Sequence, residues 1–326
     1  MLVTGASGLI GSHVLGLLAD QGDVVAVSRA ARPDQAGVRW LVEDLGEPGT
    51  IAGVVTSVRP DVVIHLAGAV RGERSLDAVA PTLRANLVAT VELLEAATRA
   101  GCERIVMSGS LLEEPSDGDP RAVPPSPYGA SRWAASAYGR MFHALFDAPV
   151  VNLRPSFAYG PGQERSKLIP HVISTLLEGG SPELTSGERM LDCVYAEDVA
   201  HAYLQAASTP SVEGHTLDVG HGVQTSVREI VEAIVELVGP VAGRPLFGTL
   251  PARACEQDVR PDVDETARVL GWRASIGLDE GLRRTVAWYR KLGPSRSVAP
   301  GENPAELAAN RRQDCADDLS RPRGYG

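Results

Sequence analysis

Residues 1–20 read MLVTGASGLIGSHVLGLLAD, in which a short apolar run meets Gly5, Gly8 and Gly11 and then an apolar helical pattern. This order predicts a strand, a tight turn and a helix. Gly5 allows the chain to reverse, Gly8 lets the backbone approach a pyrophosphate, and Gly11 lets the new helix pack closely on the sheet. The amino end of such a helix offers free N–H groups and a partial positive charge, so the stretch predicts a dinucleotide-binding turn.

The composition is that of an ordinary globular protein. The chain has 326 residues, of which 44% are hydrophobic and 22% charged. No apolar run approaches the roughly 18 to 20 residues that cross a bilayer, and no basic leader precedes the first strand, so we expect a cytoplasmic protein without a membrane partner. Four scattered cysteines predict neither a disulfide framework nor a metal site. The net charge of -10 argues against a nucleic-acid partner.

Apolar strand-like runs alternate with helical patterns through the first half of the chain. We expect strands over 23–28, 39–42, 62–66, 104–108 and 150–154, and helices over 83–100 and 128–145. This alternation predicts an α/β fold, a Rossmann-type doubly wound parallel sheet with helices on both faces.

The pattern loosens after residue 152. Expected helices cover 168–177, 198–207, 227–238, 267–271 and 278–291, with strands over 190–195 and 215–220. Ser226 and Glu229 have the spacing of a capping box. We therefore expect a dinucleotide-binding domain over 1–152, a smaller mixed α/β substrate-binding part over 153–292 that is interleaved with the first, and a disordered tail over 293–326.

The residues about 20 positions beyond the glycines bear on the cofactor. NAD-binding proteins of this design place an acidic residue there for the ribose 2′-hydroxyl, whereas this chain has Ser28, Arg29 and Arg32. A hydroxyl and guanidinium groups suit a 2′-phosphate, so the sequence favours NADP, with NAD as the alternative.

Three side chains are candidates for chemistry. Ser110 follows the strand expected over 104–108, and Tyr128 opens the helix expected over 128–145. Arg132 lies four residues after Tyr128 and shares its helix face, with roughly 5 to 6 Å between the two Cβ atoms. The hydroxyl, the phenol and the cation are therefore expected to converge on one bound carbonyl oxygen. His65 lies in an apolar strand and is expected in the core.

These residues together resemble the extended short-chain dehydrogenase/reductase family, in its NAD(P)-dependent nucleotide-sugar epimerase, dehydratase and ketoreductase branch. The resemblance covers nearly the whole chain up to about Leu292. The motifs that carry it are TGASGLIG over 4–11, HLAG over 65–68, Asn86, SGS over 108–110, SPYGAS over 126–131, RPSFAYGPG over 154–162 and DCVYAEDV over 192–199.

The resemblance implies hydride transfer between a nicotinamide ring and a sugar carbon. It assigns Tyr128 as the general acid and base, Ser110 as the hydroxyl that orients the substrate oxygen, and Arg132 to the place of the family's lysine. The implied cofactor-binding residues are Gly5, Ser7, Gly8, Leu9, Ile10, Gly11, Ser28, Arg29, Arg32, Asp44, Leu45, Leu66, Ala67, Gly68, Asn86, Tyr128, Arg132 and Pro155. The implied substrate-binding residues are Ser110, Phe157, Lys167, Leu168, Arg189 and Tyr195.

Two departures from the family pattern narrow the choice of reaction. A cation about 5 Å from the phenol stabilises its ionised form by about 3 kcal/mol at an effective dielectric constant near 20, so Arg132 can replace a lysine electrostatically. It does not release a proton as a lysine can. Leu111 and Leu112 follow Ser110 where dehydratases carry an acidic pair, which argues against a 4,6-dehydratase.

A third departure weakens the expected contacts with a nucleotide diphosphate. Phe157 and Leu191 stand where relatives often carry asparagine and arginine. Arg165, Lys167 and Arg189 are expected to supply positive charge instead.

Three functions follow from this reading. The leading one is an NADPH-dependent 4-ketoreductase of a nucleotide-linked deoxysugar. The alternatives are a nucleotide-sugar 4-epimerase with a tightly held cofactor, and a catalytically impaired dinucleotide-binding sensor or scaffold. Apolar residues extend beyond one face of the helices over 83–100 and 128–145, which predicts a homodimer.

Overall fold

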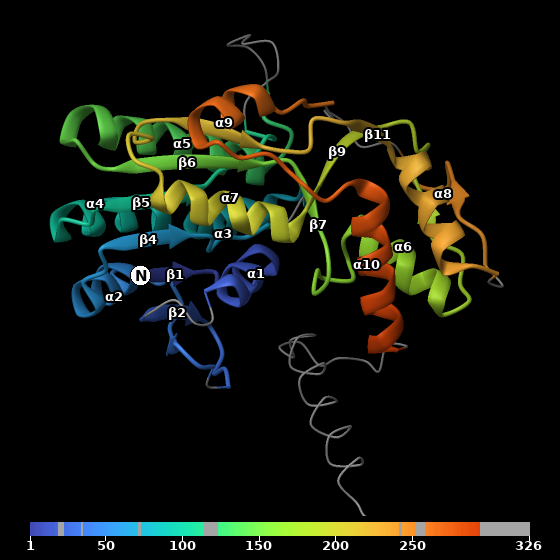
Figure 1. Ribbon diagram of the computed structural model, residues 1–326, viewed down its shortest axis with the longest axis horizontal. Helices are drawn as coiled ribbons and strands as arrows, with labels where there is room; N and C mark the ends of the chain where they lie inside the picture. Colours follow the sequence, from blue (N-terminus) through green and yellow to red (C-terminus); the bar gives the residue numbers. More distant parts are fainter. Residues whose placement is uncertain are drawn as a thin grey trace, which may run out of the picture.

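A seven-stranded parallel sheet forms the centre of the molecule (Figure 1). The computed structural model describes residues 1–18, 23–33, 35–70, 73–113, 123–240, 243–251 and 258–293; the tail expected over 293–326 lies outside these ranges except for Gly293. The strand order is β10-β6-β5-β4-β1-β2-β3, and every pairing in this sheet is parallel. The strands are β1 (Leu2–Thr4), β2 (Val24–Ser28), β3 (Val38–Val42), β4 (Val62–His65), β5 (Arg104–Ser108), β6 (Val150–Pro155) and β10 (Thr216–Val219).

Helices cover both faces of this sheet because successive strand side chains point in opposite directions. Val3, Ala26 and Ile64 belong to one apolar cluster and Leu2, Val25 and Val63 to the other. The first face packs against α1 (Leu9–Leu17), α7 (Ala196–Ser208) and α9 (Val263–Leu270), and the second against α2 (Thr50–Val58), α4 (Ala89–Ala100) and α5 (Pro127–Phe146). The expected doubly wound fold is confirmed.

A smaller mixed part with its own apolar core lies beside the carboxyl ends of the strands (Figure 1). In it β11 (Gln224–Ser226) pairs antiparallel with β9 (Met190–Tyr195), and β7 (Phe157–Tyr159) pairs parallel with β9. Its helices are α6 (Leu168–Leu177), α8 (Val227–Val238) and α10 (Leu278–Leu292). A short pair, β8 (Glu183–Leu184) and β12 (Leu246–Phe247), completes this part. The capping box of Ser226 and Glu229 at the start of α8 is confirmed.

Several elements differ from the sequence-based expectation. Helix α2 was not anticipated, although it buries Ile51, Val54 and Val55. The helix expected from residue 83 is preceded by η1 (Leu76–Ala78) and α3 (Val79–Leu83), and its first turn is the π-helical η2 (Arg84–Val88). Helix α9 begins before residue 267 because the Asp262 side chain caps it, accepting from the Glu265 N–H at 3.0 Å.

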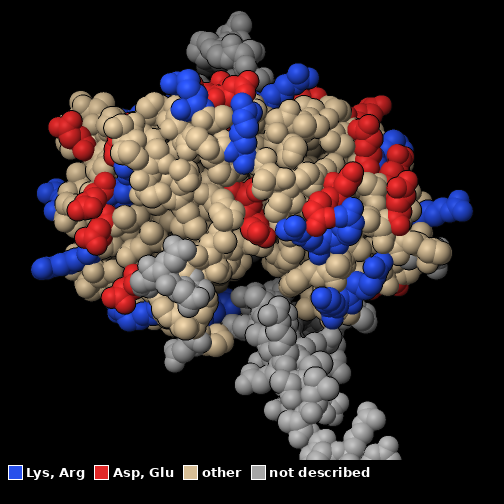
Figure 2. Space-filling view, viewed as in Figure 1, with Lys and Arg blue, Asp and Glu red and all other residues tan. Residues whose placement is uncertain are grey.

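The surface carries both signs of charge. Figure 2 shows acidic and basic side chains interspersed on one face, without a broad basic area. Across the described ranges, no helix has the length and apolar character needed to span a membrane. Within the same ranges, no group of His, Cys, Asp and Glu side chains is arranged to hold a metal ion.

Candidate active site

In the glycine turn between β1 and α1, the backbone packs closely against neighbouring backbone atoms. Gly5 has a φ of 65°, and a β-carbon on it would lie 2.5 Å from the Ala67 nitrogen. A β-carbon on Gly11 would clash with the Gly5 carbonyl oxygen, whereas Gly8 is exposed. Leu9 and Ile10 lie in the first turn of α1, where backbone N–H groups have no intrahelical acceptor. No side chain caps this end of the helix either. The backbone of this turn is accessible where the sequence predicts a pyrophosphate contact, and that contact stays a prediction.

Residues expected at the adenosine end lie on loops after two neighbouring strands. Ser28 ends β2 and donates its hydroxyl to the Ala30 carbonyl oxygen. Arg29 is exposed and Arg32 half-buried in the loop that follows. After β3, the Asp44 carboxylate accepts from the Gly46 N–H at 2.9 Å, and Leu45 is buried. Both loops lie at the carboxyl edge of the sheet, where ligands bind in folds of this type.

A chain of hydrogen bonds through His65 and Thr4 holds the loop after β4 in place. The His65 Nδ1 lies 2.7 Å from the Thr4 hydroxyl, which accepts from the Ala67 N–H, and His65 Nε2 lies 3.1 Å from the Thr90 hydroxyl. Thr90 donates to the Asn86 carbonyl oxygen at 2.7 Å, so it accepts from Nε2, and Nδ1 accepts from Thr4. Burial above all, and the Arg132 charge, lower the pKa of His65 to about 3. The expected core histidine is confirmed.

Asn86 connects this loop to α5. It is fully buried in η2, where its Oδ1 accepts from the Ala69 N–H at 2.7 Å. Its Nδ2 donates to the Ala69 carbonyl oxygen at 3.1 Å and to the Ser131 hydroxyl at 3.0 Å. The side chain therefore holds the 66–69 loop against α5, with Leu66, Ala67 and Gly68 on the side of the glycine turn. Single π-helical turns of this kind often occur at functional sites.

Tyr128 and Arg132 occupy the first two turns of α5. The Ser126 hydroxyl caps this helix by accepting from the Gly129 N–H at 3.2 Å. Tyr128 is half-buried, whereas Arg132 is only 2% exposed. The Arg132 Nη1 donates to the Ser108 carbonyl oxygen at 2.7 Å, and its Cζ lies 5.7 Å from the centre of the Tyr128 ring. The guanidinium thus lies between the end of β5 and the Tyr128 ring, as the spacing predicted.

Ser110 lies on the loop that leaves β5 and is held against the start of α5. Its hydroxyl oxygen accepts from the Leu112 N–H at 3.2 Å. The Leu112 carbonyl oxygen is so close to Gly129 that a β-carbon there would approach it to 2.6 Å. The structure therefore brings the loop of Ser110 together with the first turn of α5, which carries Tyr128. The carbonyl oxygen of Pro155, at the end of β6, accepts from the Leu111 N–H at 3.3 Å and so ties the same loop to β6.

Glu113 is a buried carboxylate that the sequence patterns did not single out. Its Oε1 accepts from the Ser110 N–H at 2.5 Å, and its Oε2 accepts from the Ser136 hydroxyl at 2.7 Å. Burial raises the pKa of Glu113 to about 7, against the opposing effect of these hydrogen bonds and of Arg154 and Arg132. The sequence carries no local signal for this burial, because no helix begins at Ser110 in the described residues and the partner Ser136 lies on α5.

Apart from Ser110, the residues expected to meet the substrate come from the second part. Phe157 is half-buried on β7, Leu168 starts α6, and Arg189 precedes β9. The Lys167 Nζ donates to the Val70 carbonyl oxygen at 2.5 Å and so links the second part to the loop after β4.

Tyr195, an expected substrate residue, and Arg165, an expected source of positive charge, both make contacts within the second part. Tyr195 is 2% exposed, with its ring centre 5.7 Å from that of Tyr159. Arg165 pairs with Glu178 at 3.1 Å and donates to the Gly293 carbonyl oxygen at 3.1 Å. Both side chains therefore stabilise the packing of the second part.

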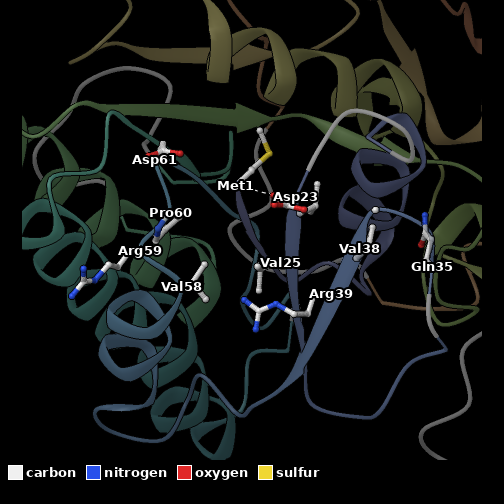
Figure 3. A pocket seen from close by; sticks show the side chains of 12 residues that line it. Met1, Asp23, Val25, Gln35, Val38, Arg39, Val58, Arg59, Pro60 and Asp61 are labelled. Atoms are coloured by element: carbon white, nitrogen blue, oxygen red, sulfur yellow. Dashed lines mark hydrogen bonds between the residues drawn. The ribbon is translucent and has the colours of Figure 1, made fainter.

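A cavity of about 540 Å³ lies at the opposite edge of the sheet (Figure 3). It is lined by Met1, Asp23, Val38, Arg39 and Asp61, among others, at the amino ends of β1 to β4. The terminal amine of Met1 donates to the Asp23 carbonyl oxygen at 3.1 Å. Because the glycine turn and Ser110 lie at the carboxyl ends of the strands, this cavity is separate from the candidate active site.

Comparison with known proteins points to one family. A family model described as the NAD dependent epimerase/dehydratase family matches residues 1–220. The UDP-glucose 4-epimerase of Mycolicibacterium smegmatis is 31% identical over 314 residues, which cover 89% of this chain and 98% of that protein. A dTDP-glucose 4,6-dehydratase of an Actinoplanes species is 30% identical and is covered to 97%, with 89% of this chain aligned.

Solved structures show the same fold with dinucleotides bound. MoeE5 in complex with UDP-glucuronic acid and NAD is 33% identical, with a TM-score of 0.80 over 89% of this chain and 98% of that one. The Thermus thermophilus UDP-glucose 4-epimerase in complex with NAD is 27% identical, with a TM-score of 0.77 and the same coverage.

Proposed function

Because the chain belongs to the NAD dependent epimerase/dehydratase family, we propose that it is a nucleotide-sugar 4-epimerase that acts on a UDP-hexose. The observation that supports this most is the buried Arg132 beside the Tyr128 ring and the end of β5, with the loop that carries Ser110 packed on the first turn of α5. MoeE5 and the Thermus epimerase were solved with NAD, and MoeE5 also with UDP-glucose or UDP-glucuronic acid.

The proposed roles follow from the chemistry of these side chains. A dinucleotide held at Gly5, Gly8 and Gly11 would supply a nicotinamide ring that takes a hydride from the sugar C4 and returns it to the opposite face once the 4-keto sugar has turned over. Tyr128 takes the proton of the C4 hydroxyl and later gives it back, while Ser110 donates a hydrogen bond to the same oxygen. Arg132, buried beside the Tyr128 ring, stabilises the phenolate form that Tyr128 needs before it takes the proton and regains when it gives the proton back.

A 4,6-dehydratase is a less suitable assignment. That reaction needs an acidic group beside Ser110 to remove the C6 hydroxyl. Leu111 and Leu112 follow Ser110, and the next acidic side chain, Glu113, is turned inward to the Ser110 N–H and Ser136. Glu114 lies outside the described residues. The dehydratase relatives therefore share the fold and cofactor chemistry of this chain, and we propose that the elimination step is absent here.

An NADPH-dependent 4-ketoreductase of a nucleotide-linked deoxysugar is the second candidate. It is favoured by Ser28, Arg29 and Arg32, which follow β2 where a 2′-phosphate would lie. A free NADPH pool drives net reduction, whereas an epimerase keeps its cofactor bound and needs none to be added.

The experiment that separates these candidates uses the purified protein. An epimerase converts UDP-glucose to UDP-galactose without added cofactor, and Tyr128→Phe lowers that rate by about 100-fold or more. A ketoreductase instead consumes NADPH only when a 4-keto sugar nucleotide is supplied. Binding of dinucleotide without either turnover would support the sensor or scaffold alternative.

We also propose that the protein is a homodimer. Six large apolar side chains on α3, η2 and α5 are between 41% and 68% exposed, namely Val79, Leu83, Val88, Tyr138, Leu145 and Phe146. A self-complementary pairing of these helices would cover them. Light scattering is expected to give twice the chain mass, and Leu145→Glu is expected to reduce it to one chain mass. A wild-type protein with one chain mass at 50 µM or so would contradict this proposal.

A further inference from the structure

Ser110 and Glu113 hold each other in a reciprocal pair. The Glu113 carboxylate accepts from the Ser110 N–H at 2.5 Å, and the Glu113 N–H donates to the Ser110 carbonyl oxygen at 3.1 Å. The Ser110 hydroxyl oxygen accepts from the Leu112 N–H, which uses one of its lone pairs. Over the described part of the chain, no acceptor for the hydroxyl hydrogen of Ser110 is seen, so that hydrogen is available to a substrate oxygen.

The Glu113 side chain is itself held from two elements. Its Oε2 accepts from the Ser136 hydroxyl of α5, and Ser136 accepts from the Asn152 Nδ2 of β6 at 2.8 Å. Glu113 is 1% exposed, and a β-carbon on Gly109 would clash with its Oε1. A carboxylate enclosed in this way has one orientation, because rotation would lose a hydrogen bond in a buried place.

We propose that Glu113 is a positioning residue of the active site, whose carboxylate fixes the Ser110 backbone and thereby aims the Ser110 hydroxyl at the substrate oxygen. This inference depends on the proposed role of Ser110. It adds a residue that acts through Ser110 without touching the substrate.

The ionised form of Glu113 does this best, because only that form accepts at both oxygens. The charged groups that face it are Arg132 from α5 and Arg154 from β6, and both favour the ionised form. From α7, the buried Tyr203 phenol lies near enough to Glu113 and Arg132 to interact with both. Burial opposes ionisation and brings the pKa of Glu113 to about 7, so the orientation of Ser110 is expected to change with pH in the neutral range.

A double-mutant cycle tests whether Glu113 acts through Ser110. We expect Glu113→Gln to lower kcat/KM about tenfold in the wild-type background and less than about twofold in a Ser110→Ala background. Wild-type kcat/KM is expected to show an ionisation near pH 7 that is absent from Glu113→Gln. Equal losses in both backgrounds would overturn the proposal.

Asp198 provides a matched control. It is another buried carboxylate that accepts from two N–H groups and one serine hydroxyl, those of Ser275 and Ile276. Asp198→Asn is expected to lower kcat/KM by the same factor with and without Ser110→Ala, because it acts on stability elsewhere.

A second measurement needs no turnover, so it separates failure of this inference from failure of the proposed function. In ¹⁵N-labelled protein, the Ser110 amide signal is expected to shift with a midpoint near pH 7 and to stay constant in Glu113→Gln. The Asp198→Asn protein is expected to keep the shift. A Ser110 amide signal that does not change between about pH 5.5 and 8.5 in the wild type would overturn the proposal.

Discussion

The Arg132 guanidinium lies over Gly68 so closely that no β-carbon fits between them. A β-carbon on Gly68 would clash with Arg132 Nη2 and lie 2.6 Å from the Asn86 Oδ1. Gly68 is otherwise exposed, so the restriction comes from the side chains of Arg132 and Asn86. The glycine after β4 therefore leaves the space that the Arg132 guanidinium occupies.

Gly68→Ala is expected to displace the Arg132 guanidinium. We expect turnover to fall by tenfold or more, while the free energy of unfolding falls by only about 1–2 kcal/mol, because the flexible end of Arg132 can move. The control is Gly53→Ala, an exposed position inside α2 with no atom within 4 Å of the new β-carbon. It is expected to raise stability by about 0.5–1 kcal/mol and leave turnover unchanged. Parallel losses of turnover and stability in Gly68→Ala would contradict this account.

Arg132 is expected to act mainly through its charge. Arg132→Lys keeps a cation beside the Tyr128 ring, so we expect it to retain turnover within about tenfold of the wild type. Arg132→Met removes the charge and is expected to lower turnover about 100-fold. Both rates are measured with UDP-glucose, alongside circular dichroism to confirm folding. Equal rates in the two variants would show that the charge does not matter.

His65 is expected to make stability depend on pH on the acidic side. Its pKa is about 3 in the folded protein and 6.5 when unfolded, so it contributes stability that is present above pH 6.5 and lost as the pH falls toward 3. Urea unfolding of the wild type and of His65→Gln measures this. The stability advantage of the wild type is expected to shrink by about 2 kcal/mol between pH 7.5 and pH 5. A constant difference would mean that His65 is not held neutral.

Glu113 is expected to make stability depend on pH in the opposite direction, with the free energy of unfolding falling as the pH rises. Its pKa rises from 4.5 to about 7 on folding, so the stability it contributes is present below pH 4.5 and lost as the pH rises through 7. Relative to the wild type, Glu113→Gln is therefore expected to gain about 3 kcal/mol in unfolding free energy between pH 4.5 and pH 7.5. Urea unfolding at both pH values checks this, and a gain below about 1 kcal/mol would contradict the buried position of the carboxyl.

The loop after β2 is expected to decide the choice between NADP and NAD. Replacing Arg29 and Arg32 by alanine removes two cations from the place of a 2′-phosphate, so the Kd for NADPH is expected to rise about tenfold or more while that for NADH changes little. Calorimetric titration of both dinucleotides gives the ratio. An equal change for the two would mean that neither arginine meets the 2′-phosphate.

The fold follows from local patterns to a large extent. Buried parallel strands carry continuous apolar runs, and the glycines from Gly5 to Gly11 mark a turn in which backbone atoms pack closely, so both were predictable. The capping box of Ser226 and Glu229 was predictable because both partners lie within one turn. The pairing of β10 with β6 joins residues more than 60 positions apart, and no local pattern specifies it.

The site was predictable in its chemistry and less so in its packing. The spacing of Tyr128 and Arg132 places them on one helix face, and the structure confirms it. Glu113 was missed because an acidic residue after a strand is usually solvated, and its burial is tolerable only through the tertiary hydrogen bond from Ser136, which itself accepts from Asn152. The π-helical turn that holds Asn86 against Ala69 depends in the same way on the packing of α5.

The central claim is that Tyr128 moves a proton at the sugar C4 while a bound dinucleotide holds the hydride. The most direct test mixes the purified wild-type protein and its Tyr128→Phe variant with UDP-glucose, without added cofactor, and follows UDP-galactose by nuclear magnetic resonance. We expect UDP-galactose to form with the wild type and to form about 100-fold more slowly with Tyr128→Phe. Equal rates for the two proteins, or no product from a wild type that carries dinucleotide, would contradict the account.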